Sequence, residues 1–265
     1  MYLKNIVEIK KLKFGYQSLL FNDFNLEITS SFISITGSNG SGKSTLAKIL
    51  SGVLSYEGEI KINDVKLDQI NSKDIVLISE NLENKDDLDT AYDNMKYTLK
   101  KLGYQKEEIT DKITEISKNL KIEKILDYSI HHLSSGEKQL INLACQILPE
   151  PKILILDNAT SMLNEDQKKN VFKYLKKLNH DKKIIIMNFT SNPEETIYGT
   201  QIVLLHQGKV ILNKPTKKAL LEEKTFKSCN LDLPFMASLS LKLKYYGLVD
   251  ELVLDMNKMV NKLWK

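Results

Sequence analysis

The first 35 residues alternate between hydrophobic and polar positions, as strands with one buried face do. A period of two places every second side chain on the same side of a sheet. The alternating runs cover residues 6–9, 12–14, 24–28 and 32–35. Glycines between residues 37 and 42 end the last run, and residues 44–50 then follow a helical pattern up to Gly52. The pattern predicts a small β layer, a buried strand, a glycine-rich loop and a helix, in that order.

Between residues 86 and 148 the apolar positions recur every three or four residues, which is typical of amphipathic helices. The positions that share this period are Leu88, Ala91, Tyr92, Met95, Leu99 and Leu102, followed by Ile109, Ile113, Ile116 and Leu120. We expect these residues to form a helical layer inserted into the chain.

Short apolar runs return after this insert, and such runs are typical of parallel strands that are buried on both faces. They cover residues 153–156, 184–186 and 202–205, with a polar helix expected over 165–178. A segment rich in Lys and Leu follows Pro215, contains Pro234 and predicts a helical tail. The predicted organisation is an α/β core over residues 1–85 and 150–215, a helical subdomain over 86–149 and a C-terminal helical extension over 216–265.

Composition limits the classes of protein that this chain can be. Its 265 residues, 42% hydrophobic and 27% charged, suffice for a sizeable core and exclude a miniature or wholly disordered chain. All 38 basic residues are lysine and the net charge is only +4. Because arginine makes the bidentate contacts of most duplex readers, we expect no nucleic-acid partner.

Cysteine usage and hydropathy bear on the compartment. Cys145 and Cys229 lie far apart without a CxxC partner, which favours packing roles in a reducing cytoplasm over a disulfide framework. No apolar stretch approaches the roughly 18 to 20 residues that span a bilayer, and residues 1–10 carry Lys and Glu instead of a signal-peptide core. We expect the chain neither to cross a membrane nor to be exported.

The glycine-rich segment over residues 37–44, here called the phosphate loop, fits the pattern G-x-x-x-x-G-K-S/T. Its members are Gly37, Ser38, Asn39, Gly40, Ser41, Gly42, Lys43 and Ser44. Glycines let successive backbone N–H groups converge on phosphate oxygens, and the following helix adds the positive end of its dipole. In this pattern Lys43 reaches the β and γ phosphates and Ser44 places its hydroxyl on Mg²⁺, with Thr45 beside them.

Two later segments, Leu133–Gln139 and Ile153–Ser161, follow the phosphate loop in an order that resembles an ABC-transporter ATPase over about residues 6–215. The resemblance implies a P-loop ABC ATPase core that binds ATP and Mg²⁺. The family's signature then corresponds to Leu133–Glu137, in which Ser134, Ser135, Gly136 and Glu137 would contact nucleotide. Its magnesium-binding aspartate corresponds to Asp157, and its adenine-stacking aromatic residue to Tyr16 or, as the alternative, Phe14.

The C-terminal tail resembles the extension of energy-coupling factor transporter ATPases. The residues that carry this resemblance are Leu231–Met236, Leu239, Leu241, Leu243 and Tyr246–Leu248. It implies pairing with a second ATPase subunit at the cytoplasmic face of the membrane. There the pair would drive a transmembrane coupling protein and a substrate-binding membrane subunit that imports vitamins or metal ions, with residues 80–104 receiving the membrane partner. An ordinary amphipathic helix that begins at a proline is the alternative.

Several positions depart from the family's pattern. Asn158 occupies the position of the glutamate that polarises the attacking water, and Ser191 or Asn188 that of the switch histidine. Glu80 falls on the position of the loop glutamine, where it would ligate the metal, act as a displaced base or remain a solvated side chain. Asn164 replaces an aspartate, and Ser135 and Glu137 are changes within the signature; we expect these last three changes to be tolerable.

The loss of the base, the switch histidine and the loop glutamine together favours a subunit whose own site binds Mg-ATP but hydrolyses it poorly, because an amide cannot act as a general base. We expect a heterodimer in which the signature of this chain completes the site of a partner ATPase. Two alternatives stay open at this point: a catalytically active subunit of another ABC transporter, and a nucleotide-binding regulatory scaffold that does not hydrolyse ATP.

Overall fold

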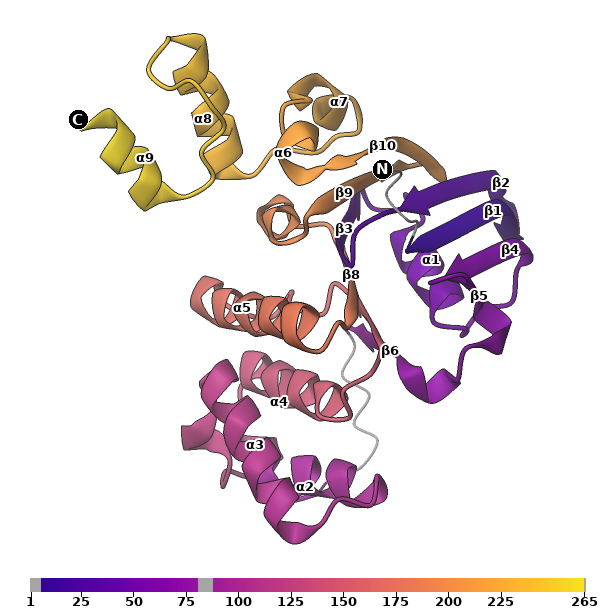
Figure 1. Cartoon of the computed structure of the whole chain (residues 1–265), viewed down its shortest axis with the longest axis vertical. Coiled ribbons are helices and arrows are strands. Elements are labelled where there is room, and N and C mark those ends of the chain that lie inside the picture. The colour runs from indigo at the N-terminus through magenta and orange to yellow at the C-terminus, as the bar shows by residue number, and fades with distance from the viewer. Residues whose placement is uncertain (1–5, 81–87, 265) are drawn as a thin grey trace. The chain divides into compact units, whose positions relative to one another are not determined.

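The computed structural model describes residues 6–80 and 88–264 (Figure 1). The chain falls into two compact units, the first formed by residues 1–70 and 187–265 and the second by residues 71–186. Residues 81–87, which belong to the stretch expected to receive a membrane partner, lie outside the described part, as do the first two residues of the expected helical insert.

An antiparallel sheet forms the N-terminal layer of the first unit. It consists of β1 (Val7–Gly15), β2 (Leu19–Ile28), β4 (Glu57–Ile62) and β5 (Val65–Lys66), in the order β2-β1-β4-β5. Val7 is the register partner of Ile28 on one side and of Ile62 on the other. All three side chains are buried, so the cross-strand row they form is one reason for the alternating pattern. The predicted β layer is confirmed.

Four further strands, one of which ends in the phosphate loop, lie side by side in a second sheet. They are β3 (Phe32–Gly37), β8 (Ile185–Thr190), β9 (Gln201–His206) and β10 (Lys209–Pro215), in the order β10-β9-β3-β8. β3 and β9 are parallel, and every residue of β3 is buried, which explains its continuous apolar run. Helix α1 (Lys43–Leu50) follows the loop and buries Leu46, Ala47, Ile49 and Leu50.

The C-terminal extension begins as part of the core of the first unit. Its helices are α6 (Thr216–Ala219), α7 (Glu223–Ser228), α8 (Phe235–Tyr245) and α9 (Met256–Leu263). Residues of the first part pack in one cluster with β9; the cluster includes Phe226, Cys229, Leu233, Ala237, Ile202 and Leu204. A separate small cluster joins Val249, Val253 and Met259. The predicted helical tail is confirmed, and Pro234 directly precedes α8 as expected.

The second unit combines a parallel strand pair with helices. The strands are β6 (Ile75–Ser79) and β7 (Ile153–Asp157), and the helices are α2 (Ala91–Lys101), α3 (Lys106–Leu120), α4 (Ser135–Ile147) and α5 (Glu165–Asp181). The expected apolar stripe on α2 and α3 is buried at Ala91, Met95, Leu99, Ile109, Ile113, Ile116 and Leu120. Leu102 departs from it and is 50% exposed, because α2 ends at Lys101 and Leu102 only caps it.

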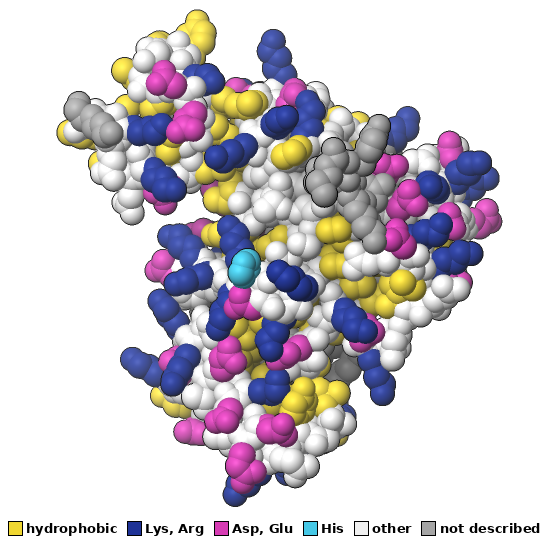
Figure 2. Space-filling view, viewed as in Figure 1, with side chains coloured by type: hydrophobic (Ala, Val, Ile, Leu, Met, Phe, Trp, Pro, Cys, Tyr) yellow, Lys and Arg dark blue, Asp and Glu magenta, His cyan; other side chains and the backbone are white. Residues whose placement is uncertain are grey.

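Charged side chains of both signs are interspersed on the face shown in Figure 2. Hydrophobic side chains also reach the surface in the C-terminal helical segment, where Tyr245, Tyr246 and Trp264 are among the most exposed. Within residues 6–80 and 88–264, no helix has the length and apolar character needed to cross a membrane.

Candidate functional site

The phosphate loop connects β3 to α1 through a backbone that requires glycine at its end. Gly42 caps the start of α1 with φ of 104°, a left-handed conformation in which side chains other than glycine are strained. The Ser41 amide donates to the Ser38 carbonyl at 3.1 Å, and the Leu46 amide donates to the Gly42 carbonyl at 2.9 Å. The loop is therefore a compact turn that leads directly into the first turn of the helix.

Lys43 folds back over this loop. Its Nζ donates to the Gly37 carbonyl at 2.6 Å and to the Ser38 carbonyl at 3.1 Å, and the residue is 5% exposed. These bonds hold an ammonium group against the backbone that would surround a phosphate. Ser44 is exposed in the first turn of α1, whereas Thr45 is half-buried. Asn39 and Gly40 are exposed at the tip of the loop.

The turn between β9 and β10 braces the phosphate loop. The Gly208 amide donates to the Ser41 carbonyl at 3.0 Å, and the register of β3 and β9 pairs Gly37 with Leu205. Sequence reasoning did not find this brace. The available signal was the Gln207-Gly208 pair between two strand-like runs, since such pairs mark tight hairpin turns.

Phe14 lies at the end of β1 and Tyr16 just beyond it. These are the two candidates for adenine stacking. Their rings meet edge to face at a centroid distance of 5.0 Å and an angle of 87°. Tyr16 is 65% exposed, whereas Phe14 is partly buried. The Tyr16 ring is thus open to stacking, and Phe14 supports it from the side.

In the second unit, the carboxyl ends of β6 and β7 bring three candidate residues to one edge. Ser79 is the register partner of Asp157, so Glu80 and Asn158 follow at adjacent strand ends. Asp157 is 7% exposed, while Glu80 is exposed and Asn158 is half-buried. Ligands of parallel sheets bind beyond this edge, and carboxylate oxygens are ligands that Mg²⁺ prefers.

Asn158 adopts a left-handed backbone with φ of 49°. Its carbonyl accepts the Ser161 amide at 3.1 Å, which turns the chain sharply after β7. Asn tolerates this conformation better than Glu does, because its short polar side chain can bond locally. The residue type therefore suits the turn, and its neutral amide cannot accept a proton from water.

The two candidates for the switch position differ in their surroundings. Asn188 lies inside β8 and is 1% exposed, and its side-chain amide atoms have no partner among the described residues. Ser191 follows the end of β8 and is half-buried. The next residue, Asn192, donates its amide to the Thr190 hydroxyl at 3.0 Å. Ser191 thus lies at a turn after a buried strand, and Asn188 in the middle of that strand.

The signature segment forms the start of α4. Ser134 is the N-cap, and both its amide and its hydroxyl donate to the Glu137 carboxylate, at 2.9 and 2.6 Å. These bonds hold the pKa of the Glu137 carboxyl below its usual range. A Cβ on Gly136 would lie 3.0 Å from the Met162 carbonyl, so the helix start packs closely on the chain after β7.

Gln139 connects α4 to the chain segment that follows β7. It is fully buried, and its Nε2 donates to the Ala159 carbonyl at 2.5 Å. Sequence reasoning gave this residue no role, although a polar residue on the apolar face of a helix was the available signal. The bond fixes the signature helix against the turn that contains Asn158.

Asn164 is the N-cap of α5, where its side chain accepts the Gln167 amide at 2.9 Å. The side-chain amide of Asn164, at a position where the family has an aspartate, thus serves to cap α5.

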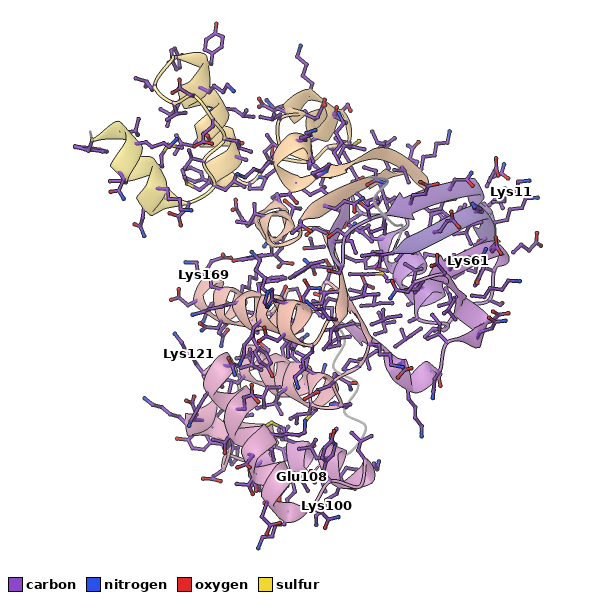
Figure 3. The ribbon with its side chains drawn as sticks, in the orientation of Figure 1. Lys11, Lys61, Lys100, Glu108, Lys121 and Lys169 are labelled. Atoms are coloured by element: carbon purple, nitrogen blue, oxygen red, sulfur yellow. The ribbon has the colours of Figure 1, made fainter. Side chains whose placement is uncertain are left out.

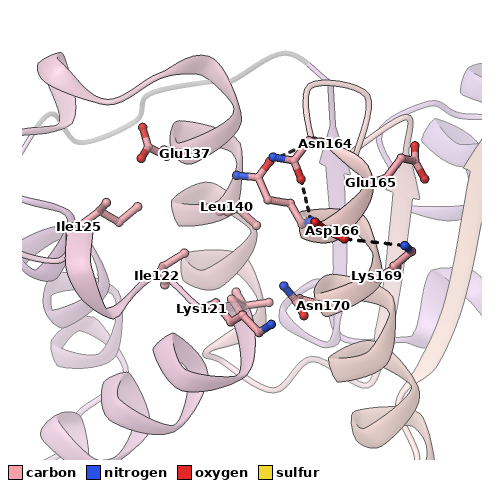
Figure 4. Close-up of a pocket in the computed structure, with 12 residues that line it drawn as sticks. Lys121, Ile122, Ile125, Glu137, Leu140, Asn164, Glu165, Asp166, Lys169 and Asn170 are labelled. Atoms are coloured by element: carbon pink, nitrogen blue, oxygen red, sulfur yellow. Dashed lines mark hydrogen bonds and ion pairs between the residues drawn. The ribbon is translucent and has the colours of Figure 1, made fainter.

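A cavity of about 730 Å³ lies between the start of α5, α4 and the end of α3 (Figure 4). Its lining includes Leu120, Lys121, Ile122, Ile125, Glu137, Leu140, Asn164, Glu165, Asp166, Gln167, Lys169 and Asn170.

Each unit by itself offers groups that suit part of a magnesium nucleotide. Lys43 and the loop amides suit phosphates in the first unit, and Ser44 offers a hydroxyl oxygen there. Asp157 and Glu80 offer carboxylate oxygens in the second. No group of three or more His, Cys, Asp or Glu that could hold a metal ion occurs among residues 6–80 and 88–264.

Comparisons with known proteins identify the family. A family model described as ABC transporter matches residues 21–161. The chain is 31% identical over 247 residues to the energy-coupling factor transporter ATP-binding protein EcfA1 of Leuconostoc mesenteroides, covering 89% of this chain and 90% of that one. It is 32% identical over 252 residues to the corresponding EcfA of Aster yellows witches'-broom phytoplasma, covering 92% and 90%.

A solved structure is similar to the chain as well. It is that of cbiO1 from Clostridium perfringens, described as part of the ABC transporter complex cbiONQ. The TM-score is 0.73 at 24% sequence identity, and the match covers 89% of this chain and 98% of that one. At this identity the likeness supports the fold.

Proposed function

The chain belongs to the ABC transporter family and, within it, to the energy-coupling factor transporter ATP-binding proteins, and from this premise we propose that its own site binds Mg-ATP but hydrolyses it poorly. The family and the mixed α/β fold expected from the sequence are thereby confirmed.

Nucleotide binding is assigned to the phosphate loop. Lys43 would leave the Gly37 and Ser38 carbonyls for phosphate oxygens, while loop amides and the start of α1 neutralise negative charge. Tyr16 would stack on the adenine. Ser44, Asp157 and Glu80 are the candidates to hold Mg²⁺. The metal, when bound, would screen the phosphate charges, and Asp157 stands at the buried end of β7.

Asn158 carries the proposal of slow hydrolysis. It stands where β7 ends, directly after Asp157, in a left-handed turn that an asparagine suits. A general base contributes roughly 10²- to 10⁴-fold to such a reaction, and an amide supplies none of this. Ser191 and Glu80 at two further positions of the family's pattern support the same conclusion.

The partners follow from the family. We propose a second ATPase subunit, preferably a different chain, whose nucleotide site is completed by Ser134–Glu137, together with a transmembrane coupling protein and a substrate-binding membrane subunit for vitamins or metal ions. The exposed aromatic residues of the C-terminal segment, Tyr245, Tyr246 and Trp264, support a role of this segment in pairing. The chain would then act at the cytoplasmic face of the membrane.

The first test measures Mg-ATP binding by calorimetry and phosphate release at steady state, for the chain alone and with each candidate partner ATPase of the same organism. We expect binding with negligible turnover by the chain alone. Asn158→Glu should raise turnover at this site by roughly 10²- to 10⁴-fold. Asn164→Asp is the matched control, since it also converts an amide at a turn of the second unit into a carboxylate, and it should leave turnover unchanged.

Brisk hydrolysis by the unaltered chain would contradict the proposal, because a group other than residue 158 would then supply the base. Glu80 would be the first candidate, and Glu80→Gln would test it. If the chain does not bind Mg-ATP at all, the assignment of the phosphate loop is wrong.

Pairing has its own test. Tyr245→Ser combined with Trp264→Ser removes two side chains that are 86% and 80% exposed, so the fold should survive. We expect the double variant to lose co-elution with the co-expressed partner ATPase in size-exclusion chromatography with light scattering. Tyr128→Ser is the matched control on the second unit, where the ring is 57% exposed. Unchanged co-elution of the double variant would exclude this surface from pairing.

A further inference from the structure

Ser134 and Glu137 form a closed pair at the start of α4. The carboxylate accepts both the Ser134 amide, at 2.9 Å, and the Ser134 hydroxyl, at 2.6 Å. The Glu137 amide donates back to the hydroxyl oxygen at 3.4 Å. The hydroxyl proton of Ser134 is thus committed to a carboxylate within the same turn, and the lowered pKa of Glu137 agrees with a carboxylate that stays charged.

A carboxylate at this place is equivalent to an anion already bound. The first turn of a helix offers unpaired N–H groups and a positive dipole end, and these attract one negative group. Glu137 lies at the third position of the helix and supplies that group from within. The Ser134 hydroxyl, which donates to Glu137, would not be available to donate to an incoming phosphate. The phosphate would also lie beside the negative charge of Glu137.

We propose that Glu137 weakens the hold of the signature on a phosphate by occupying the Ser134 hydroxyl, so that an incoming nucleotide must displace this carboxylate before the signature can close on it. This inference rests on the function proposed above, in which Ser134–Glu137 completes the nucleotide site of a partner. It adds Glu137 to that site as a specificity-determining residue. With Glu137 the signature closes on a phosphate more weakly than it would with an uncharged residue at this position.

Glu137→Gln isolates the charge, because glutamine at the third helical position also forms a capping box. The helix start should therefore keep its conformation while the negative charge is lost. The chain offers a matched control in α3. Glu108, labelled on α3 in Figure 3, likewise stands at the third helical position. Its carboxylate accepts the Gln105 amide at 2.9 Å. Glu108→Gln removes the same charge from the same type of turn, at a helix without the signature.

The experiment titrates the full-length, isotope-labelled chain with inorganic phosphate and follows the backbone amides by nuclear magnetic resonance. We expect the amides of residues 134–137 to respond in Glu137→Gln with a half-saturation concentration at least about fivefold lower than in the unaltered chain. This is the effect of one unit charge roughly 4 Å from a phosphate oxygen in a water-like medium. Glu108→Gln should match the unaltered chain.

A double-mutant cycle assigns the effect to the hydroxyl. In a Ser134→Ala background, Glu137→Gln should give a clearly smaller gain, because the donor that the carboxylate holds is gone. An equal response of residues 134–137 in the unaltered chain and in Glu137→Gln would overturn the proposal. The absence of any response in Glu137→Gln up to the solubility limit of phosphate would overturn it too, as would the same gain in Glu108→Gln.

The same sample separates this inference from the function on which it rests. Mg-ATP added to the unaltered chain should shift the amides of residues 38–45, which report the phosphate loop. If these amides do not respond, the proposed nucleotide site fails, whatever the titration at residues 134–137 gives. If they respond and Glu137→Gln has no effect, the inference alone fails.

Discussion

Gly208 offers a direct test of the brace under the phosphate loop. Its φ is 70°, and a Cβ built on it would lie 2.0 Å from the carbonyl oxygen of Leu20. Alanine therefore meets two costs at this position. The left-handed backbone costs about 1 to 2 kcal/mol, and the contact with a backbone atom, which cannot rotate away, adds about 1 to 3 kcal/mol of overpacking.

Gly247 separates these two costs. Its φ is 72°, and a Cβ there would meet no atom of the described residues within 4 Å. Gly247→Ala should thus lose only about 1 to 2 kcal/mol in free energy of unfolding, whereas Gly208→Ala should lose roughly 2 to 5 kcal/mol. Both values come from urea titrations followed by far-ultraviolet circular dichroism.

The functional consequence should differ between the two variants as well. The relief of the contact at Gly208 displaces the amide that donates to Ser41, and a hydrogen bond of this kind contributes about 1 kcal/mol. We therefore expect Gly208→Ala to weaken Mg-ATP binding about fivefold in calorimetry, and Gly247→Ala to leave it unchanged. Equal stabilities and equal affinities of the two variants would refute the reasoning.

Three further predictions concern the interior and the signature. Burial raises the pKa of the Cys145 thiol to about 12, and Cys229 is buried as well. The raised pKa keeps the Cys145 thiol protonated near neutral pH, so neither cysteine should react with Ellman's reagent until urea unfolds the chain; rapid labelling of the native chain would contradict this. Gln139→Leu should lower the free energy of unfolding by about 1 to 3 kcal/mol, because it leaves a buried carbonyl unpaired, whereas Gln146→Leu on the same helix should cost less. The lowered pKa of Glu137 means that its charged form is stabilised on folding. This contribution is present above the ordinary carboxyl pKa and is lost as the pH falls through the lowered value. The stability difference between the unaltered chain and Glu137→Gln should hence shrink as the pH is lowered from 7 through the carboxyl range, and a constant difference would contradict it.

Local signals in the sequence account for most of the elements. Period-two alternation predicted the antiparallel layer, since Val7, Ile28 and Ile62 lie in one cross-strand row. The three-to-four residue period predicted α2 and α3, because Met95 and Ile113 face a buried side. The pattern extended one position too far at Leu102, since periodicity does not report where a helix ends.

Contacts between segments distant in the sequence could not be predicted in this way. The bond from Gly208 to Ser41 joins residues that no local pattern relates, and so does the bond from Gln139 to Ala159. The pair of Ser134 and Glu137 is different, because a serine followed three residues later by a glutamate is itself a capping signal. The candidate positions at the end of β7 were found by family resemblance, and only the structure reveals the left-handed backbone of Asn158.

The packing of the C-terminal extension on β9 limits how the chain can be rearranged in engineering. Phe226, Leu233 and Ala237 share one apolar cluster with Ile202 of β9, and β9 lies beside the strand that ends in the phosphate loop. The extension therefore cannot be exchanged as a separate segment that begins after Pro215, because its first part belongs to the core of the first unit. A chimera that grafts the tail of another relative should be joined beyond the end of α8, so that the graft replaces Tyr246 and Trp264 of the exposed aromatic surface and leaves Phe226, Leu233 and Ala237 in place.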